Sequence, residues 1–577
     1  MSTKPSILTA AIIAGCVAPT FANPINATAP TTSWTLEIED VVTIPNSPGT
    51  GGQKPRVEDL VFGGAPGLAY VLDQRGTIYT FDPASPSPTA TEFFDIYDVV
   101  GNANIGFQTG LRGMAFHPGF NDSGSDGYRK FYTSHSRDAF ASPPAEQTAP
   151  KFFNSPPGLD HDSAVGEWTV DATGQVIPSS YREVIRVGQP FDDHNIGQIG
   201  FNPNAAAGDA DYGNLYIALG DGGGAGDPRN LAQDISTTTS GSGGKGFPHG
   251  SILRVDPLES GGAPFSVPAD NPFVGQANTI EEVWAYGLRN PHKFVWDTAA
   301  EEKMLISDIG QGNVEEVNLG VAGANYGWDA REGTFLYDNP GSVGALPGGH
   351  PTDAFTYPVA QYDHDLNNNG FVDGLLAIVG GPVYRGDAIP ELRGKYFFGD
   401  FAEGNKLWAV NVDELVEQDD FTSLGALSGG NLAPYEEVRL TSGGSPTTLL
   451  DLIRPGSGDN GLTRTDIRLE EGPDGEVYLL NKRDGVIRRF ASTDGLQAGD
   501  FNGDGSVDLA DYTTWRDLRG VRYEERDYQV WVDNFGSQLS DTSAGGSAND
   551  LSGVPEPTAL LLASLGAIAL RRRAVVR

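Results

Sequence analysis

The chain has 577 residues, with 38 Lys or Arg against 76 Asp or Glu, so its formal net charge is −38. Charge of this sign repels phosphate backbones and anionic lipids, which argues against nucleic acid as a partner. The chain is 38% hydrophobic and 10% aromatic, enough for a core, and its 76 glycines and 39 prolines indicate many turns. We therefore expect a folded, loop-rich all-β protein.

Residues 1–22 have the pattern of a secretory signal peptide. Lys4 precedes an apolar run, Ile7–Val17, that is too short to span a bilayer, and Ala22 stands at the expected cleavage site. The single cysteine, Cys16, lies in this run, so disulfides and cysteine-ligated zinc are excluded. A lipoprotein signal with a lipidated Cys16 is the alternative. In both cases we expect export to the periplasm, the cell surface or the medium.

Residues 35–492 consist of short apolar runs separated by turns that contain glycine. Repeated hairpins joined by long Gly- and Pro-rich loops are typical of a β-propeller, in which radial repetition protects the sheet edges. A β-sandwich array would show the same periodicity. Hairpins are expected at Gly67–Phe81, at Asn214–Gly220 with Ser251–Val255, at Lys395–Phe398 with Lys406–Val410, and at Gly475–Phe490.

Seven ordered motifs in this region carry a resemblance to a known family. They are Gln108–Phe120, Asp193–Phe201, Leu215–Gly223, Glu282–His292, Asp308–Asn318, Asn325–Trp328 and Gly380–Gly386. Together they resemble the PQQ-dependent soluble glucose/sorbosone dehydrogenase family, over about residues 60–490. The resemblance implies a six-bladed β-propeller that oxidises the C1 hydroxyl of an aldose sugar.

Asp193 and His194 match the family's catalytic pair, in which the histidine is the general base on the sugar hydroxyl. Histidine suits this role because its pKa lies near neutrality, and the adjacent carboxylate could orient its ring. The alternative for His194 is a structural histidine. If the resemblance holds, the hydride of the sugar passes to PQQ.

The resemblance also implies a set of cofactor contacts. Gln108 falls on a glutamine that contacts PQQ, while Arg289 and Asn290 fall on an Arg-Asn pair that faces the quinone oxygens and assists catalysis. The backbone carbonyls of Gly310 and Gln311 fall on the ligands of the active-site calcium ion, which acts on the quinone as a Lewis acid. Arg289 could instead pair with a carboxylate such as Glu282.

The positions that hold the three carboxylates of PQQ depart from the family. The family uses a lysine and paired arginines from its last blades; here Lys406 is displaced, and Arg464 and Arg468 do not align with the pair. An alternative is therefore a propeller of the same family that has lost its cofactor and binds carbohydrate or another protein. A sugar-lactone hydrolase is less favoured, because the metal-binding carboxylates of propeller lactonases are not evident.

Residues 493–499 form a linker, and residues 500–540 form a small helical module. The segment 511–520 recurs sixteen residues later as 527–536, which predicts two short helices. Before the first copy, oxygen-bearing side chains stand at loop positions 1, 3, 5, 9 and 12 with glycine at 6, the spacing of a calcium cage. The predicted calcium residues are these five, Asp500, Asn502, Asp504, Asp508 and Asp511, together with Ser506 at position 7.

This pattern resembles the dockerin type I repeat. The second copy lacks the ligand spacing, so we expect one calcium ion, and the resemblance implies a cohesin-like or other protein partner. Residues 541–553 form a second linker.

Residues 554–577 resemble the PEP-CTERM sorting signal. Pro555-Glu556-Pro557 precedes an apolar stretch, Thr558–Leu570, and the basic cluster Arg571–Arg573. The resemblance implies processing by an exosortase-type enzyme, with membrane contact through this helix alone. A simple C-terminal membrane anchor is the alternative.

Overall fold

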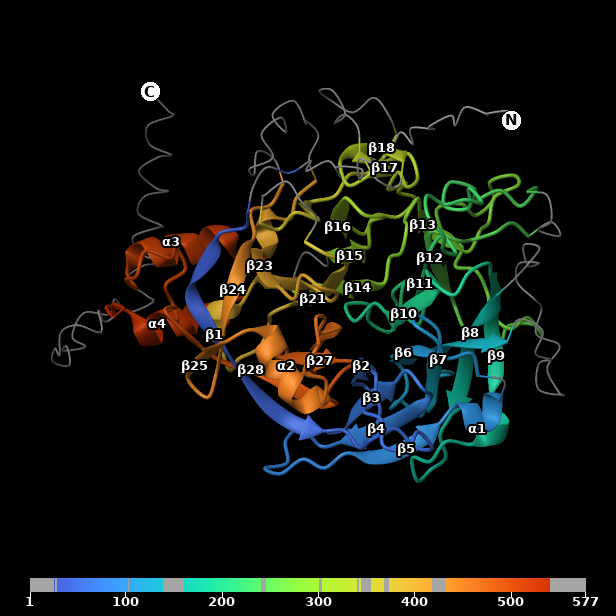
Figure 1. Cartoon of the computed structure of the whole chain (residues 1–577), viewed down its shortest axis with the longest axis horizontal. Coiled ribbons are helices and arrows are strands. Elements are labelled where there is room, and N and C mark those ends of the chain that lie inside the picture. The colour runs from blue at the N-terminus through green and yellow to red at the C-terminus, as the bar shows by residue number, and fades with distance from the viewer. Residues whose placement is uncertain are drawn as a thin grey trace, which may run out of the picture.

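The computed structural model describes residues 25, 28–101, 103–138, 160–239, 245–299, 303–339, 342–343, 354–367, 373–417 and 432–539. Strands dominate this part of the chain, and the sheets are arranged around a central axis (Figure 1). The signal-peptide residues 1–22 and the sorting-signal residues 554–577 lie outside the described residues. None of the described helices has the length and apolar character needed to span a bilayer.

Four sheets share one plan, in which four strands follow one another in chain order and pair antiparallel with their neighbours. The first sheet contains β2 (Val57–Val61), β3 (Ala69–Asp73), β4 (Thr77–Phe81) and β5 (Thr91–Asp95), and the second contains β6 (Leu111–Phe116), β7 (Lys130–Asp138), β8 (His161–Thr169) and β9 (Arg182–Gln189). The third contains β10 (Ile196–Phe201), β11 (Leu215–Leu219), β12 (Ser251–Val255) and β13 (Val283–Tyr286). The fourth contains β14 (Lys293–Trp296), β15 (Met304–Asp308), β16 (Val314–Leu319) and β20 (Ala360–Asp363).

The remaining propeller strands form one larger sheet, which the N-terminal strand holds together. β1 (Thr31–Thr43) pairs in parallel with β24 and antiparallel with β28, so it joins the last two groups of strands and leaves neither edge open. Along the path, the sheet contains β21 (Ile378–Val383), β22 (Lys395–Asp400), β23 (Leu407–Asn411), β24 (Glu436–Ser442), β1, β28 (Val486–Asp494), β27 (Val477–Asn481) and β26 (Ile467–Glu471), with β25 (Ser445–Thr447) beside β24.

The innermost strands of these groups form a closed ring. β2, β6, β10, β14, β21 and β26 each contact the next around the axis, and β26 contacts β2. Apolar side chains fill the space between neighbouring sheets, as where Ile217 packs with Val165 and Val187; each such buried side chain contributes about 1.5–3 kcal/mol. All four expected hairpins are present. The mostly β, propeller-like architecture is confirmed.

Short elements lie in the connections between these strands. They are α1 (Tyr97–Val100), α2 (Leu449–Ser457), the 3-10 turns at Pro178–Ser180, Pro390–Leu392 and Val412–Glu414, and a small sheet of β17 (Arg331–Glu332), β18 (Phe335–Asn339) and β19 (Ser342–Val343). Thr448 caps the N-terminus of α2, because its side chain accepts a hydrogen bond from the Asp451 amide.

The strands at the two ends of the propeller are longer than the sequence predicts. β28 continues to Asp494, which pairs with Thr35 of β1, so residues 493–494 belong to a strand and not to the linker. β1 begins at Thr31, before the expected boundary at residue 35. Pairing between the chain ends, which a local pattern does not reveal, extends both strands.

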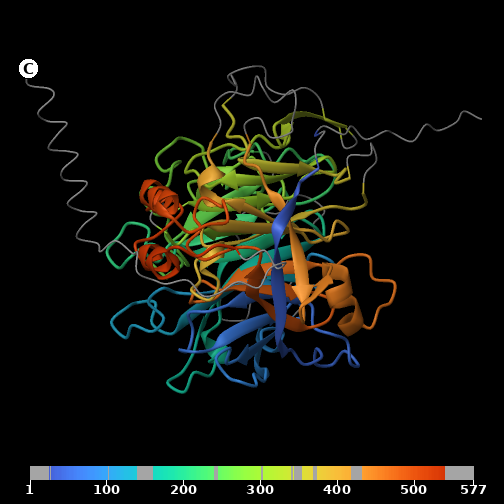
Figure 2. The same ribbon diagram turned by 90° about the vertical axis from the view of Figure 1, so that its left-hand side faces the viewer.

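Two helices follow, α3 (Leu509–Leu518) and α4 (Asp527–Asn534), and pack through an aromatic cluster that includes Trp515 and Trp531. The pair lies against the propeller (Figure 2). Arg393 forms a buried ion pair with Asp527, and the Arg385 guanidinium donates a 2.7 Å hydrogen bond to the Arg522 carbonyl. The sequence set this module apart behind a linker, whereas the structure docks it on the propeller.

Candidate active site

His194 and Asp221 form a buried dyad at the end of the propeller where the inner strands begin. His194 stands two residues before β10, and Asp221 two residues after β11, its antiparallel neighbour. His194 Nδ1 lies 2.6 Å from Asp221 Oδ1, whereas Nε2 lies 3.8 Å from the Oδ2 atom of the half-exposed Asp193. Asp221, and not its neighbour in sequence, therefore orients the ring.

Asp221 is itself held in one orientation. Oδ1 also accepts a hydrogen bond of 2.9 Å from the Gly223 amide, and Oδ2 accepts one of 2.8 Å from Trp328 Nε1. Burial would raise the pKa of Asp221, but the charge and hydrogen bond of His194, with the nearby Arg289, hold it below its ordinary value. The carboxylate therefore stays ionised and can stabilise a protonated His194.

The backbone at His194 takes a conformation that few side chains adopt. Its φ is +52°, and a Cβ at Gly220 would lie 2.6 Å from the His194 carbonyl oxygen. Left-handed backbone at a residue other than glycine costs energy and often marks a functional site. Gln108 supports this turn: its Oε1 accepts a 3.1 Å hydrogen bond from the His194 amide. Two residues predicted from separate motifs thus lie together.

Arg289 and Asn290 lie beside the dyad. The Asp221 amide donates to the Arg289 carbonyl at 2.8 Å, and the Arg289 guanidinium lies 5.6 Å from the centre of the Trp328 ring. The amides of Arg289 and Asn290 donate to the two oxygens of Asp308, at 2.9 and 2.7 Å. The prediction that these residues share one site with His194 agrees with this arrangement.

The predicted calcium loop is built around one carboxylate. Glu332 Oε1 accepts hydrogen bonds of 2.8–3.1 Å from the four successive amides of residues 311–314. The Arg289 guanidinium donates to the carbonyls of Ile309 at 2.8 Å and Gly310 at 2.6 Å, and to the Gln311 side chain at 3.3 Å. A cation at the Gly310 carbonyl would be repelled by this guanidinium, so the site fits calcium only after Arg289 has moved.

Burial has a marked effect on the two carboxyl groups behind this loop. It raises the pKa of Asp308 to about 7, against the hydrogen bonds from Arg289 and Asn290. Burial and the neighbouring Asp308 raise the pKa of Glu316 to about 8. In the described residues, no group of three or more His, Cys, Asp or Glu side chains is arranged to hold a metal ion.

The basic residues considered for the PQQ carboxylates all have partners within the protein. Lys406 pairs with Glu437 at 2.6 Å. Arg468 is buried and pairs with Glu58 at 3.3 Å. Arg464 lies 5.3 Å from the ring centre of Phe107, the residue before Gln108, and both Arg464 and Arg468 lie over the ring of Phe401, at 5.7 and 5.0 Å. An aromatic ring with a guanidinium beside it fits a flat anion such as PQQ.

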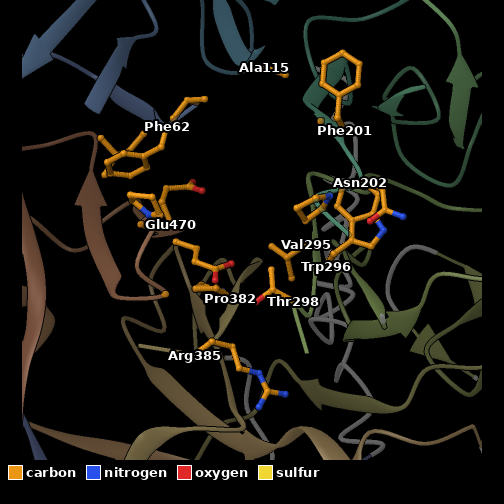
Figure 3. Close-up of a pocket in the computed structure, with 18 of the residues that line it drawn as sticks. Phe62, Ala115, Phe201, Asn202, Val295, Trp296, Thr298, Pro382, Arg385 and Glu470 are labelled. Atoms are coloured by element: carbon orange, nitrogen blue, oxygen red, sulfur yellow. The ribbon is translucent and has the colours of Figure 1, made fainter. Parts of the chain in front are cut away.

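A cavity of about 720 Å³ lies at the other end of the axis, and the predicted site residues do not line it. It is bordered by the far ends of the inner strands, and Figure 3 shows Phe201, Trp296 and Glu470 around it. Glu524 and Arg526 of the docked module also line this cavity. Because catalytic geometry is what defines an active site, we take the His194 end as the candidate active site.

In the loop of residues 500–511 the predicted calcium residues bind mainly backbone amides, and their carboxylates do not form a metal-binding group in the described part of the chain. Asp500 accepts hydrogen bonds from the Gly503, Asp504 and Gly505 amides at 2.7–3.1 Å, and Asp511 accepts from the Asn502 amide at 3.0 Å. Asp508 instead caps α3, accepting from the Ala510 amide at 2.7 Å. The amide of Ser506 donates to Asp504 at 3.0 Å.

The fold and the site together define a propeller with a histidine–aspartate dyad. The profile of the Glucose / Sorbosone dehydrogenase family matches residues 71–426, and the chain belongs to this family. An aldose sugar dehydrogenase of Escherichia coli, solved in its apo-form, shares the fold with a TM-score of 0.50; it is 18% identical, and the match covers 80% of this chain and 99% of that one.

Curated relatives include both enzymes and binding proteins by name. HIPL1 protein of Arabidopsis thaliana is 30% identical over 59% of this chain and 48% of its own length. Aldose sugar dehydrogenase YliI of Escherichia coli (strain K12) is 24% identical over 36% of this chain and 47% of its own length. Hedgehog-interacting protein of Homo sapiens is 26% identical over 57% of this chain and 39% of its own length. The chain thus spans half or less of the length of each.

Two members of the site were not predicted from the sequence. Asp221 and Trp328 both stand in motifs that point to the family, but neither was given a role there. The signal available was the position of Asp221 two residues after a buried strand, where side chains from neighbouring strands converge.

Proposed function

We propose that this protein oxidises the C1 hydroxyl of an aldose to the lactone, with PQQ as the hydride acceptor and His194 as the general base. The observation that carries the proposal is the His194–Asp221 dyad, which lies with Gln108 and Arg289 at one end of a propeller of this family. PQQ, when bound, supplies the quinone that takes the hydride from C1.

His194 is suited to take the hydroxyl proton. Its Nδ1 is occupied by Asp221, while Nε2 lies 3.8 Å from Asp193, has no closer partner among the described residues, and can accept a proton from the substrate. The ionised, buried Asp221 stabilises the imidazolium that results. Trp328 and the Gly223 amide keep the carboxylate from rotating, so the ring is positioned before the sugar arrives.

Arg289 and Asn290 have the complementary role. Both are more than nine-tenths buried, and both backbone amides are fixed on Asp308, so their side chains extend from a rigid turn. In the proposal they hold the ring oxygens of the cofactor. A calcium ion at the Gly310 carbonyl then requires the Arg289 guanidinium to turn from that carbonyl toward the cofactor.

The test is to supply PQQ and calcium to the purified chain and to measure dye-linked aldose oxidation together with PQQ binding. We expect uptake at micromolar PQQ and turnover, and we expect His194→Ala to lose about 10²- to 10⁴-fold in rate while it still binds PQQ. A folded wild-type protein that takes up no PQQ would refute the enzymatic proposal.

The second candidate function is binding of carbohydrate or protein without the cofactor. It is favoured by the similarity to Hedgehog-interacting protein and by the Arg289 guanidinium, which occupies the carbonyl assigned to calcium. In that case PQQ uptake is absent, and His194→Ala leaves partner binding unchanged.

For the ends of the chain we propose export through the residue 1–22 signal and sorting through residues 554–577 by an exosortase-type enzyme. For the loop of residues 500–511 we propose one calcium ion in a dockerin-like module. The support is the spacing of its ligands in the sequence and the convergence of Asp500 and Asp511 on one loop backbone.

A further inference from the structure

Basic side chains surround the segment Gly106–Gln108, which leads to the His194 turn. Arg56 Nη1 donates to the Gly106 carbonyl at 3.0 Å. Arg464 lies over the Phe107 ring. The Gln74 side chain donates to the Phe107 carbonyl at 3.1 Å and accepts from Lys482 Nζ at 3.4 Å. Cations from the first and last groups of strands thus meet at the residues that adjoin Gln108.

These cations outnumber the carboxylates that they contact. Arg464 and Arg483 share Asp466, with distances of 2.7 and 2.5 Å. Glu58 is shared by three further cations, which are Arg112, Arg468 and Lys482. With Arg56 there are six basic side chains against these two acids, in a chain whose net charge is −38. The nearby Asp73 is matched separately by Arg75 at 3.6 Å.

The electrostatic strain in this group appears in its titration. Burial would raise the pKa of Glu58, but Arg112, Lys482 and Arg468 hold it well below its ordinary value. Burial, opposed by Glu58, lowers the pKa of Lys482 to about 7. An anion placed beside Lys482 would raise this pKa again and so favour the charged form of the side chain.

The cations form two levels. Arg112 and Arg468 are buried, with side chains 3% and 2% exposed. Arg464, Arg483 and Lys482 reach solvent, with 18%, 32% and 11% exposed. The apolar neighbour of the exposed level is Phe107, an aromatic ring that is 58% exposed. A ligand at this level meets guanidinium groups at its edge and an aromatic face beside it.

We propose that Arg56, Arg464, Lys482 and Arg483 bind the carboxylates of a flat, polyanionic ring ligand beside Phe107, and so hold PQQ in place of the lysine and arginine pair of the family. We call these four residues the cationic wall. Arg56 stands at the start of the first sheet, Arg464 in the segment before β26, and Lys482 and Arg483 in the β27–β28 turn. The proposal rests on the proposed function, because the wall adjoins the segment that positions Gln108 and His194.

The experiment measures binding and needs no turnover. The full chain is titrated with PQQ, with its trimethyl ester and with benzene-1,3,5-tricarboxylate, and tryptophan fluorescence and calorimetry report binding at low and high salt. The test variants are Arg56→Gln and Arg464→Gln/Arg483→Gln. Arg516→Gln is the matched control, because it removes one exposed arginine that pairs with Asp517 in the C-terminal module. Circular dichroism checks the fold of each variant.

We expect the wild type to bind PQQ and the tricarboxylate, and to bind the ester at least about tenfold more weakly, since charge-assisted hydrogen bonds are lost. Arg56→Gln and the double variant should each bind PQQ and the tricarboxylate about tenfold or more weakly than the wild type, and high salt should reduce this difference in affinity. Arg464→Lys/Arg483→Lys should recover part of the loss. Arg56→Gln keeps the proposal testable if the double variant is unstable, since its guanidinium bonds to a carbonyl and leaves no carboxylate unpaired.

The outcomes separate the wall from the reaction. If PQQ binds but every wall variant matches Arg516→Gln, the cationic wall is refuted while the proposed function stands. If the wall variants lose the tricarboxylate but the wild type does not bind PQQ, the wall stands and the PQQ-dependent function is refuted. A wild type that binds neither acid refutes both.

Discussion

Replacing Asp221 by Asn tests the proposed dyad with little change in side-chain shape. Asp221 is only 1% exposed to solvent, and its Oδ1 lies 2.6 Å from His194 Nδ1. A hydrogen bond to a buried charged group contributes about 1.5–3 kcal/mol, and about 1.4 kcal/mol in a barrier is a factor of ten in rate. Asp221→Asn should therefore lower turnover by about 10- to 100-fold, and more if the amide favours the other tautomer of His194.

The assay is dye-linked aldose oxidation with PQQ and calcium present, with PQQ affinity measured separately by fluorescence. The affinity for PQQ should change little, because Asp221 contacts the base and not the cationic wall. Asp193→Asn is the control: Asp193 lies 3.8 Å from Nε2 with its side chain 35% exposed, so we expect less than about a threefold change. Full turnover in Asp221→Asn would refute the reasoning, and an equal loss in Asp193→Asn would return the orienting role to the sequence neighbour.

Three further outcomes are expected. Calcium should protect residues 500–511 of the full chain from hydrogen exchange, because the loop carries four aspartates that repel one another without it; equal exchange with chelator would contradict this. Arg393→Glu should destabilise the docked module by about 3–5 kcal/mol and expose it to proteolysis, because it leaves Asp527 buried without its partner. Adding Asp527→Arg should restore docking, and a failure to do so would show that the pair is incidental. Burial and Asp297 raise the pKa of Glu471 to about 8, so the folded state binds a proton that the unfolded state releases, and stability falls as pH rises from about 4 to 8. In thermal melts, Glu471→Gln should reduce this dependence of stability on pH. An unchanged dependence would show that another group titrates.

The C-terminal module is where sequence and structure differ most in organisation. Its aromatic repeat predicted two helices, and α3 and α4 are present. The sequence placed this module behind a linker with a cohesin-like or other protein partner, yet Arg522 and Arg526 contact Arg385 of the propeller with hydrogen bonds of 2.7 Å. A partner of this module therefore has to use a face that the propeller leaves open, or to displace the docked helices.

Local pattern determined much of this protein. Hairpins such as Gly67–Phe81 follow from alternating apolar residues around a turn, because both strands and the turn lie within one short segment. The order of the seven motifs indicated the family, and the pairing of Gln108 with His194 agrees with that resemblance. These features depend on residues near one another in sequence, or on a pattern repeated along the whole chain.

Only the tertiary structure decided which partners these residues have. Asp193 adjoins His194 in sequence, but antiparallel pairing of β10 with β11 brings Asp221 to Nδ1, because strand ends from different hairpins converge at the axis. The cationic wall joins Arg56 to Lys482 across more than four hundred residues. Such contacts exist because β1 closes the ring between the chain ends, and no local periodicity encodes where a closed ring places its first and last strands.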